Sequence, residues 1–346
     1  MPNMKQHLSR FSFLSQFRLL PLILVVSLLS PLTSHAESVP EDLIGDWTLY
    51  LSTKEPAWLK VEEMDGEPVV HMRVHVQSAG PHKIKEFKNG RITFDMKIKR
   101  EIGDKGPQTK VNTVSVGLKN GKLDGLITGE WDDKEYNRIT FTGKKFPPMP
   151  SKPDLSKVRF GQPKSLFNGK DLTGWVIDNP EKRNGWRAED GMLVNVTPKT
   201  DFGSTGSYGN IQTVEHFEDF WLHIEFLIEA NRNSGVYLRG MYEAQVVDRD
   251  SRMQGLQGVG AIFSRIAPSM NAGRKPGEWQ TYDLTLVDRH VTVVLNGVTV
   301  IDNQPVEGPT GGAINTDPTL PGPIHLQGDH TSVKYRDIYL APVLME

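Results

Sequence analysis

Three Asn-Gly pairs, each set between two runs of strand-forming residues, constrain the fold of this chain more than any other feature. They are Asn89-Gly90, Asn120-Gly121 and Asn296-Gly297. Asn and Gly tolerate the positive φ angles of a type I′ turn, so each pair predicts a β-hairpin. The clearest hairpin runs from Val291 to Ile301, with β-branched residues on both sides of its turn. Long amphipathic helical patterns are absent from the sequence, and we therefore predict an all-β protein.

A proline-rich segment divides the predicted strands into two groups. Between Phe146 and Asp154 the chain has four prolines, which can continue neither a strand ladder nor a helix, so we place a stiff linker at residues 147–158. The strand-like runs of residues 41–146 are joined by tight turns and predict a small β-barrel or β-sandwich of unknown role. The runs of residues 159–346 predict a larger, two-sheet jelly roll.

The N-terminus has the order of a secretory signal peptide. Basic residues precede an apolar run from Leu19 to Leu29, and Ser34-His35-Ala36 follows it. We expect residues 1–36 to be the signal peptide, with cleavage after Ala36, since the apolar run is too short for a permanent membrane anchor. An uncleaved N-terminal anchor is the alternative. The expected mature protein is periplasmic or secreted and makes no membrane contact.

Composition excludes several classes of function. The 346 residues include 40 Lys and Arg against 42 Asp and Glu, so neither a nucleic-acid partner nor an anionic membrane surface is expected. The chain has no cysteine, which excludes disulfides, thiolate metal sites and a Cys nucleophile. No Gly-x-Ser-x-Gly motif occurs, so the sequence does not favour a serine hydrolase.

The stretch of residues 231–248 carries the predicted site. A loop rich in Asn, Ser and Gly opens into two strand-like runs that pivot at Gly240. Side chains alternate across a strand, so Glu243 and Gln245 share one face of the second run while its apolar residues share the other. An acid beside an amide, with Arg239 just before them, fits a sugar-binding groove. A solvated strand face is the alternative.

Several segments of the second domain carry a family resemblance. They are Ser165 to Trp175, Trp186 to Leu193, Asn233 to Arg239 with Tyr242 to Asp248, Pro276 to Tyr282, and Gly322 to Gln327 with Val333 to Arg336. Through them the chain resembles the 3-keto-disaccharide hydrolase domain family, also described as 3-keto-glucoside lyase/hydratase domains. The resemblance covers roughly residues 159–341 and leaves out the first domain. It implies a concanavalin-like jelly-roll β-sandwich that acts on glycosides oxidised at C3.

The strand of Glu243 is also similar to the Glu-x-Asp-x-Glu catalytic strand of laminarinase-like glycosidases, but it departs from it. Gln245 stands at the central acid and Val247 at the second carboxylate. Ordinary glycoside hydrolysis usually needs two carboxyl groups flanking the bond. Asp248 points to the other face of a regular strand and would need a β-bulge to reach the same groove. We therefore do not expect a conventional retaining mechanism.

A 3-keto sugar can be cleaved with a single base. The C3 carbonyl acidifies the C2 proton, and the glycosidic oxygen on C1 is then a β leaving group. Glu243 is the predicted base, Arg239 the donor or substrate clamp, and His330 a second acid/base candidate. The residues predicted to bind or stack on the sugar are Gln245, Gln327, Asn233, Tyr242 and Trp279. A backbone-bonded His330 and a core position for Tyr242 are the alternatives.

The cofactor is left open by the sequence. A divalent metal ion would stabilise an enolate, and its candidate ligands are Glu243, Asp248 and His330, which no spacing motif fixes. His71, Arg73 and His75 share one strand face, but these histidines would lie roughly 13 Å apart, too far for one ion. We interpret these two histidines as surface residues.

The sequence thus predicts an exported enzyme that cleaves 3-keto glycosides by C2-proton abstraction, elimination and hydration. The first alternative is a non-catalytic, lectin-like jelly roll, because this fold binds sugars in lectins as well as in enzymes. The second is a small apolar ligand held by the N-terminal barrel, with the jelly roll as a targeting arm. A partner sugar oxidoreductase that produces the keto substrate is a further expectation.

Overall fold

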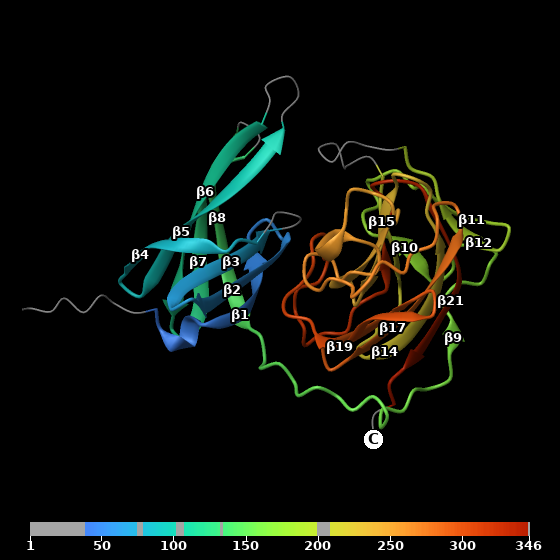
Figure 1. Ribbon diagram of the computed structural model, residues 1–346. Helices are drawn as coiled ribbons and strands as arrows, with labels where there is room; N and C mark the ends of the chain where they lie inside the picture. The colour runs from blue at the N-terminus through green and yellow to red at the C-terminus, as the bar shows by residue number, and fades with distance from the viewer. Residues whose placement is uncertain (1–38, 75–78, 102–106, 132–133, 199–207, 345–346) are drawn as a thin grey trace, which may run out of the picture. The chain divides into compact units, whose positions relative to one another are not determined.

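The computed structural model describes residues 39–344, apart from 75–78, 102–106, 132–133 and 199–207 (Figure 1). The predicted signal peptide lies outside the described residues. Residues 37–346 form one compact unit. The regular structure of the described part is β-strand, with short 3₁₀ turns at Glu41–Leu43 and Gly255–Gln257, which confirms the all-β prediction. No helix in this part of the chain is long and apolar enough to cross a membrane.

The strands before the proline-rich segment close into one antiparallel barrel (Figure 1). They are β1 (Gly45–Leu51), β2 (Pro56–Met64), β3 (Glu67–Val74), β4 (His82–Lys88), β5 (Arg91–Glu101), β6 (Pro107–Lys119), β7 (Lys122–Trp131) and β8 (Lys134–Lys145). Each strand pairs with the next, and β8 pairs with β1 to close the ring. Of the two predicted forms, barrel or sandwich, the chain adopts the barrel.

The predicted Asn-Gly pairs form the hairpin turns. Asn89 and Gly90 have φ angles of 52° and 70°, and Asn296 and Gly297 have 52° and 80°, as a type I′ turn requires. The first pair joins β4 to β5 inside the barrel. The Asn296-Gly297 pair joins two strands of the C-terminal sandwich. Inside the barrel, alternate residues of each strand meet in a core that includes Leu59, Met72, Phe94 and Val114.

The strands after the proline-rich segment form two sheets of a sandwich (Figure 1). The five-stranded sheet has the order β10 (Trp175–Ile177), β13 (Ile211–Thr213), β20 (His325–Leu326), β15 (Asn233–Leu238) and β16 (Tyr242–Val247). The larger sheet has the order β11 (Trp186–Glu189), β12 (Met192–Asn195), β21 (Val333–Pro342), β14 (Phe220–Leu227), β17 (Trp279–Val287), β18 (His290–Leu295) and β19 (Val298–Pro305), and β9 (Lys164–Ser165) pairs with β21.

One apolar core lies between these two sheets. The strand β14 shows the pattern that builds it, because Phe220, Leu222, Ile224 and Phe226 are buried while the residues between them are half-exposed. Strand β16 differs, because every one of its residues is buried. Burial of both faces means that loops cover the face of β16 that carries Glu243.

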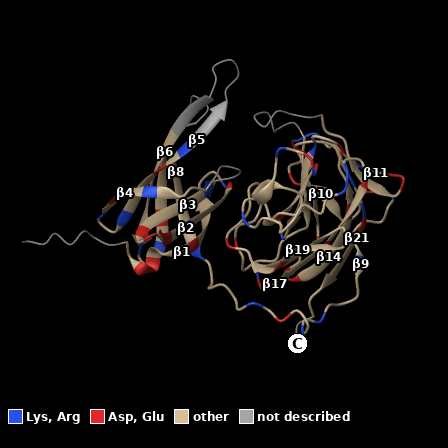
Figure 2. Cartoon of the chain, viewed as in Figure 1, with Lys and Arg blue, Asp and Glu red and all other residues tan. Residues whose placement is uncertain are grey.

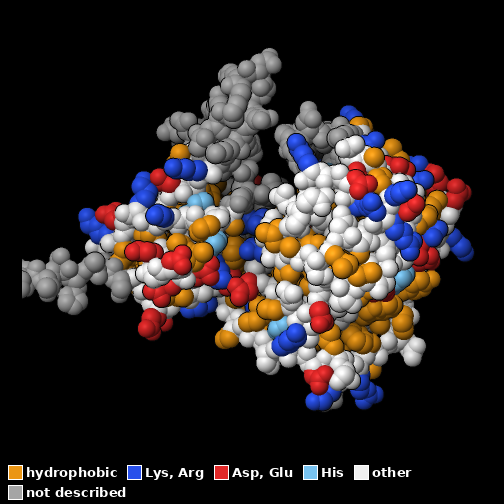
Figure 3. Space-filling model, viewed as in Figure 1, with side chains coloured by type: hydrophobic (Ala, Val, Ile, Leu, Met, Phe, Trp, Pro, Cys, Tyr) orange, Lys and Arg blue, Asp and Glu red, His pale blue; other side chains and the backbone are white. Residues whose placement is uncertain are grey.

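The proline-rich segment packs along the sandwich without forming a strand. The guanidinium of Arg289 donates to the carbonyl oxygen of Pro147 at 3.0 Å, and the amide of Asn303 donates to that of Pro153 at 2.8 Å. Charged residues occur along strands and loops on both sides of this segment (Figure 2). On the face shown in Figure 3, acidic and basic side chains are interspersed, in keeping with the net charge of −2.

Candidate functional site

A row of polar side chains crosses the five-stranded sheet. The strand register places Tyr237 of β15 directly opposite Glu243 of β16, and His325 of β20 opposite Tyr237. Gln212 of β13 continues the row beside His325. Because directly opposed residues share a sheet face, these four side chains lie on the face turned away from the apolar core. The predicted alternation therefore places Glu243 and Gln245 on the same face as this row.

Glu243 lies over a gap left by a glycine. A Cβ atom built on Gly235 would collide with the carboxylate and the Cγ atom of Glu243. Gly235 faces Gln245 across the strand pair, two residues along the ladder from the Tyr237–Glu243 pair and on the same face of the sheet. The glycine therefore permits the carboxylate to fold back across β15 and to approach the rest of the polar row.

The backbone of β16 is fixed by loops on its outer edge. Glu243 donates its N–H to the Thr310 hydroxyl at 3.0 Å, and its carbonyl oxygen accepts from the N–H of Phe263 at 3.0 Å. Gln245 donates its N–H to the carbonyl oxygen of Ala261 at 2.9 Å. These bonds hold the edge strand without sheet partners on that side, so the position of Glu243 is defined from both directions.

The environment of Glu243 is that of a buried acid. Burial raises its pKa from 4.5 to about 8, and the neighbouring Tyr237 hydroxyl and the charge of Arg73 offset part of that rise. Asp329, another acid, opposes ionisation of Glu243 by its negative charge. A buried carboxyl whose pKa lies near neutrality is suited to act as a general base or acid.

Two neighbours of Glu243 in the row are also buried and uncharged at neutral pH. Burial lowers the pKa of His325 to about 4, so its imidazole is neutral. Burial also raises the pKa of Tyr237 well above 10, and its hydroxyl donates to the carbonyl oxygen of Gly311 at 2.9 Å. The two rings meet edge to face, with centroids 5.0 Å apart. The row therefore presents neutral hydrogen-bonding groups around one acid.

Several buried polar atoms on this face have no hydrogen-bond partner among the described residues. They are Oε1 of Gln212, Gln245 and Gln327, Oδ1 of Asn233 and Nδ1 of His325. A buried polar atom without a partner costs about 1–3 kcal/mol, so a group of them on one sheet face is unusual for a purely structural surface. The same atoms could accept or donate hydrogen bonds to the hydroxyl groups of a sugar. Gln245, Gln327 and Asn233, which the sequence predicts to bind substrate, belong to this group.

His330 lies beside Asp329, just beyond the row. Its Nδ1 is 2.6 Å from Oδ1 of Asp329. Burial alone would raise the pKa of Asp329, but the hydrogen bond and charge of His330 lower it on balance. His330 therefore belongs to an acid–imidazole pair that is linked to Glu243 through the charge of Asp329.

Arg239 does not point toward the row. It lies at the turn between β15 and β16 with a φ of 58°, where strand alternation ends. Its guanidinium donates to the carbonyl oxygens of Pro318 and Leu320, at 2.9 and 2.5 Å. The side chain therefore anchors the loop that precedes β20, and this placement gives no support to Arg239 as a substrate clamp.

Two predicted stacking residues lie elsewhere in the sandwich. Tyr242 is fully buried in the core between the sheets, which matches the alternative interpretation of that residue. Trp279 lies on the larger sheet, where the Arg336 guanidinium covers its ring at 4.0 Å. Neither ring belongs to the face that carries Glu243.

The candidate metal ligands do not form a cluster. The carboxylate of Asp248 accepts backbone N–H groups from Asn231 and Asp250, both at 2.9 Å, and so fixes the end of β16. Among the described residues, no group of three or more His, Asp or Glu side chains is close enough to hold a metal ion. Glu243, Asp248 and His330 therefore do not fit a shared metal, and no chemical step is assigned to one.

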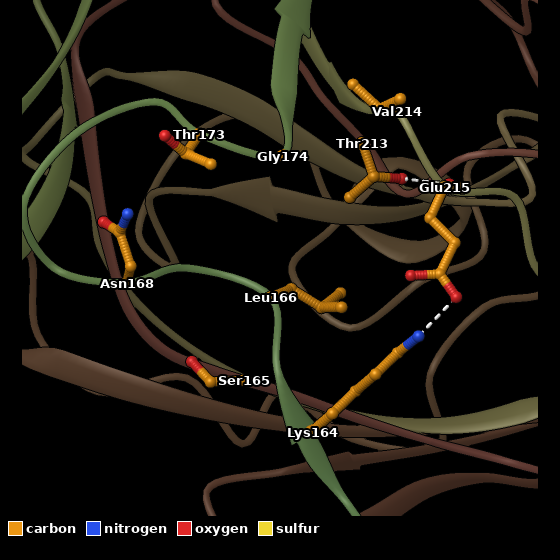
Figure 4. A pocket seen from close by; sticks show the side chains of 9 residues that line it. All are labelled: Lys164, Ser165, Leu166, Asn168, Thr173, Gly174, Thr213, Val214 and Glu215. Carbon is orange, nitrogen blue, oxygen red and sulfur yellow. Dashed lines mark hydrogen bonds and ion pairs between the residues drawn. The ribbon is translucent and has the colours of Figure 1, made fainter.

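Surface cavities occur away from the polar row. One of about 410 Å³ lies beside β9 and is lined by Leu166 and Asn168 of the opening segment of the resemblance and by Thr213 of β13 (Figure 4). An ion pair between Lys164 and Glu215 crosses its edge (Figure 4). Both partners of that pair are substantially exposed, so this cavity has the character of a surface hollow.

The match to a family model decides the affiliation of the sandwich. The model of the 3-keto-alpha-glucoside-1,2-lyase-like domain matches residues 162–341, just over half of the chain. The chain belongs to this family. The match includes every strand of the two-sheet sandwich and all the residues of the polar row, and it supports a carbohydrate-active enzyme. It leaves out the barrel.

The chain is also similar to several solved structures. A proposed glycosyl hydrolase from Parabacteroides distasonis ATCC 8503 is 23% identical, covers 53% of this chain and 94% of its own, and has a TM-score of 0.44. A second one from the same organism is 25% identical, with coverages of 52% and 98% and a TM-score of 0.39. A laminarinase from Flavobacterium sp. UMI-01 is 11% identical, with coverages of 54% and 100% and a TM-score of 0.29. A comparison with curated protein sequences finds no significant match.

The polar row contains Glu243, which the sequence singled out, and also Tyr237 and His325, which it did not. Both residues lie inside motifs that it had singled out, in Asn233–Arg239 and Gly322–Gln327. Alternation offers a signal for each of them, because Tyr237 is two residues from Gly235 and His325 is two from Gln327. The cross-strand register, which brings the two motifs together, is what the sequence alone does not contain.

Proposed function

We propose that the sandwich cleaves 3-keto glycosides by elimination followed by hydration, with Glu243 as the base. The observation that carries the proposal is a single buried carboxyl with a raised pKa, set among neutral amide, imidazole and phenol groups. A two-carboxylate hydrolysis would need a second acid facing the bond, and Gln245 and Val247 occupy the strand positions where one would be expected. The family description supports the substrate class.

In the proposed reaction, ionised Glu243 removes the C2 proton, whose acidity comes from the C3 carbonyl. The electron pair forms the C1–C2 double bond as the C1–O bond breaks, and the leaving oxygen takes up a proton. Water then adds across the double bond, hydroxyl to C1 and proton to C2. The products are the 3-keto sugar and the free alcohol. A positioned general base contributes roughly 10²- to 10⁴-fold to such a rate.

The neighbours of Glu243 would hold the substrate. The amides of Gln245 and Gln327 and the side chain of Asn233 offer unpartnered oxygens to sugar hydroxyl groups. Neutral His325 can donate a hydrogen bond toward the oxygen of the enolate, because a buried donor stabilises a developing negative charge without reorganisation. His330, paired with Asp329, is the second proton-transfer group in this proposal.

Product release from a 3-keto glucoside and from its unoxidised parent tests the proposal, each with and without a chelator. We expect residues 37–346 to cleave the keto compound alone, and Glu243→Gln to lose at least about 10²-fold in kcat. A lectin would bind both compounds, release no product, and lose only part of its affinity in the variant. Loss of activity with the chelator would add a metal to the account.

The proposal includes export and the origin of the substrate. Export by the signal peptide predicted at residues 1–36 would place the enzyme in the periplasm or the medium, and N-terminal sequencing of the mature protein should then begin at Glu37. The substrate would come from an oxidoreductase that oxidises a glycoside at C3.

A further inference from the structure

Two residues on the outside of the barrel are buried. In β3, Val70 and Met72 point into the barrel core, so Arg73 points outward. Trp58 of β2 is paired with Arg73 in register and points outward beside it. Outward-facing Arg and Trp side chains are normally in contact with water, yet Arg73 is 6% exposed and Trp58 is 1% exposed. Another part of the protein therefore covers both side chains.

Loops of the sandwich cover these two residues. The guanidinium of Arg265 lies over the Trp58 ring at 4.5 Å, and Lys60 of the barrel forms an ion pair with Glu307 at 2.6 Å. A Cβ atom on Gly311 would lie 2.9 Å from Nη1 of Arg73. The loop backbone thus lies close against the guanidinium, and a side chain at Gly311 would displace it.

The same loop residue leads to the polar row. The carbonyl oxygen of Gly311 accepts the hydrogen bond of the Tyr237 hydroxyl, and Tyr237 is directly opposite Glu243. The charge of Arg73 acts on both Tyr237 and Glu243. Its Nε has no hydrogen-bond partner among the described residues. A buried guanidinium with an unpartnered donor, one loop residue away from a buried acid, is costly for a fold that does not use it.

Arg73 has a distinct place among the groups that act on Glu243. Those that titrate are Tyr237 of β15, Asp329 after β20, and Tyr282 and Tyr335 from the core side. His325 continues the row as a neutral imidazole. Among the described groups that act on Glu243, Arg73 is the one with a positive charge at neutral pH.

We propose that the barrel supplies Arg73 as a positioning residue of the sandwich's site, where its guanidinium stabilises the negative charge of Glu243 and of the enolate. The inference rests on the proposed function for its catalytic part. Its structural part, a direct energetic link between Arg73 and Glu243, does not depend on the substrate. The barrel would then be a component of the active site, which accounts for its presence beside the family domain.

A double-mutant cycle tests the structural part in residues 37–346. Thermal unfolding is measured at about pH 9, where Glu243 is ionised, for Arg73→Gln, Glu243→Gln and the double variant. We expect Arg73→Gln to lower Tm in both backgrounds. The drop should be smaller, by at least about 3 °C, in the Glu243→Gln protein than in the wild type. Lys60→Gln is the matched control, because it removes another barrel charge that faces the sandwich, and its effect should be additive with Glu243→Gln. Additive effects for Arg73 as well would overturn the proposal.

Turnover of the 3-keto glucoside tests the catalytic part. We expect Arg73→Gln to lose about 100-fold in kcat/KM, mainly in kcat, while Arg73→Lys keeps part of it and Lys60→Gln keeps all of it. Equal losses in the Lys and Gln variants would contradict a role for the charge. If Arg73→Gln does not fold, the cycle is run with Arg73→Lys. Lysine has no guanidinium group, so the coupling between residues 73 and 243 should be weaker. Coupling in Tm without any wild-type turnover would refute the proposed function and leave the Arg73–Glu243 link standing.

Discussion

The carboxylate of Glu243 occupies the space that a Cβ atom on Gly235 would need. The two residues lie on neighbouring strands, two positions apart along the ladder, and the glycine leaves the space that the acid fills. This relationship joins the two halves of the motif between residues 231 and 248. It also explains why a glycine, which weakens a strand, is found in the middle of β15.

Gly235→Ala should therefore displace Glu243. We expect kcat/KM for the keto substrate to fall by about 100-fold, because a misplacement of the order of 1 Å in a catalytic group has that effect. Gly161→Ala is the control, since its added Cβ would meet only ordinary contacts of 3.4 Å or more. Turnover of Gly235→Ala within threefold of wild type would show that the carboxylate does not need the space beside Gly235.

Glu243 should also destabilise the protein at alkaline pH. Its pKa is about 8 in the folded state against 4.5 in the unfolded chain, so between these values the folded state holds a proton that the unfolded chain has released. The stability contributed by this group is full below pH 4.5 and is lost as the pH rises through 8. We expect Glu243→Gln to be more stable than wild type at about pH 9, by on the order of a few kcal/mol.

Chemical unfolding at several pH values measures this difference. It should shrink as the pH falls toward 4.5, where both proteins carry a neutral group at this position. A constant difference across the pH range would mean that Glu243 titrates normally, and the case for a buried base would then fail.

His325 makes the opposite contribution at acid pH. Burial lowers its pKa to about 4 from 6.5, so the stability it contributes is present above pH 6.5 and is lost as the pH falls through 4. His325→Phe keeps a ring against Tyr237 and should lose this acid sensitivity, seen as a smaller drop in Tm between about pH 7 and pH 4. The variant should also turn over the keto substrate more slowly, because it removes a hydrogen-bonding group from the row. An unchanged acid response would mean that His325 is solvated.

Arg239 is expected to matter for folding more than for catalysis. Arg239→Met removes the hydrogen bonds to the Pro318 and Leu320 carbonyl oxygens, and Tm should fall by several degrees. The kcat of the variant that remains folded should stay within about tenfold of wild type, since the guanidinium does not face the row. A large loss of kcat at an unchanged Tm would restore Arg239 as a substrate clamp.

Local sequence signals were sufficient for much of the fold. The Asn-Gly turns, the strand alternation and the four prolines act over a few residues, and they predicted hairpins, an all-β chain and a strand-free segment after Phe146. The closure of β8 onto β1 depends on contacts between residues about a hundred positions apart, which no local pattern encodes. The division into residues 41–146 and 159–346 remains a prediction, because residues 37–346 form one compact unit.

The candidate site shows the same difference between local patterns, which a sequence contains, and long-range contacts, which it does not. Glu243 and Gln245 were predicted because period-two alternation is a property of one strand. Arg239 was misplaced because alternation stops at its positive-φ turn, and Trp279 because its strand lies in the other sheet. The burial of Arg73 was not predicted, because a sequence shows which side of a strand faces outward but not what covers that side.

The isotope content of the product tests the central claim most directly. A 3-keto glucoside deuterated at C2 is offered to residues 37–346 in ordinary water, next to the unlabelled compound. Removal of the C2 proton by Glu243 predicts slower cleavage of the deuterated substrate and a keto sugar whose C2 has lost its deuterium, with uncatalysed exchange measured in a sample without enzyme. Equal rates with deuterium retained at C2 would mean that the C1–O bond is hydrolysed directly, and the elimination account would be wrong.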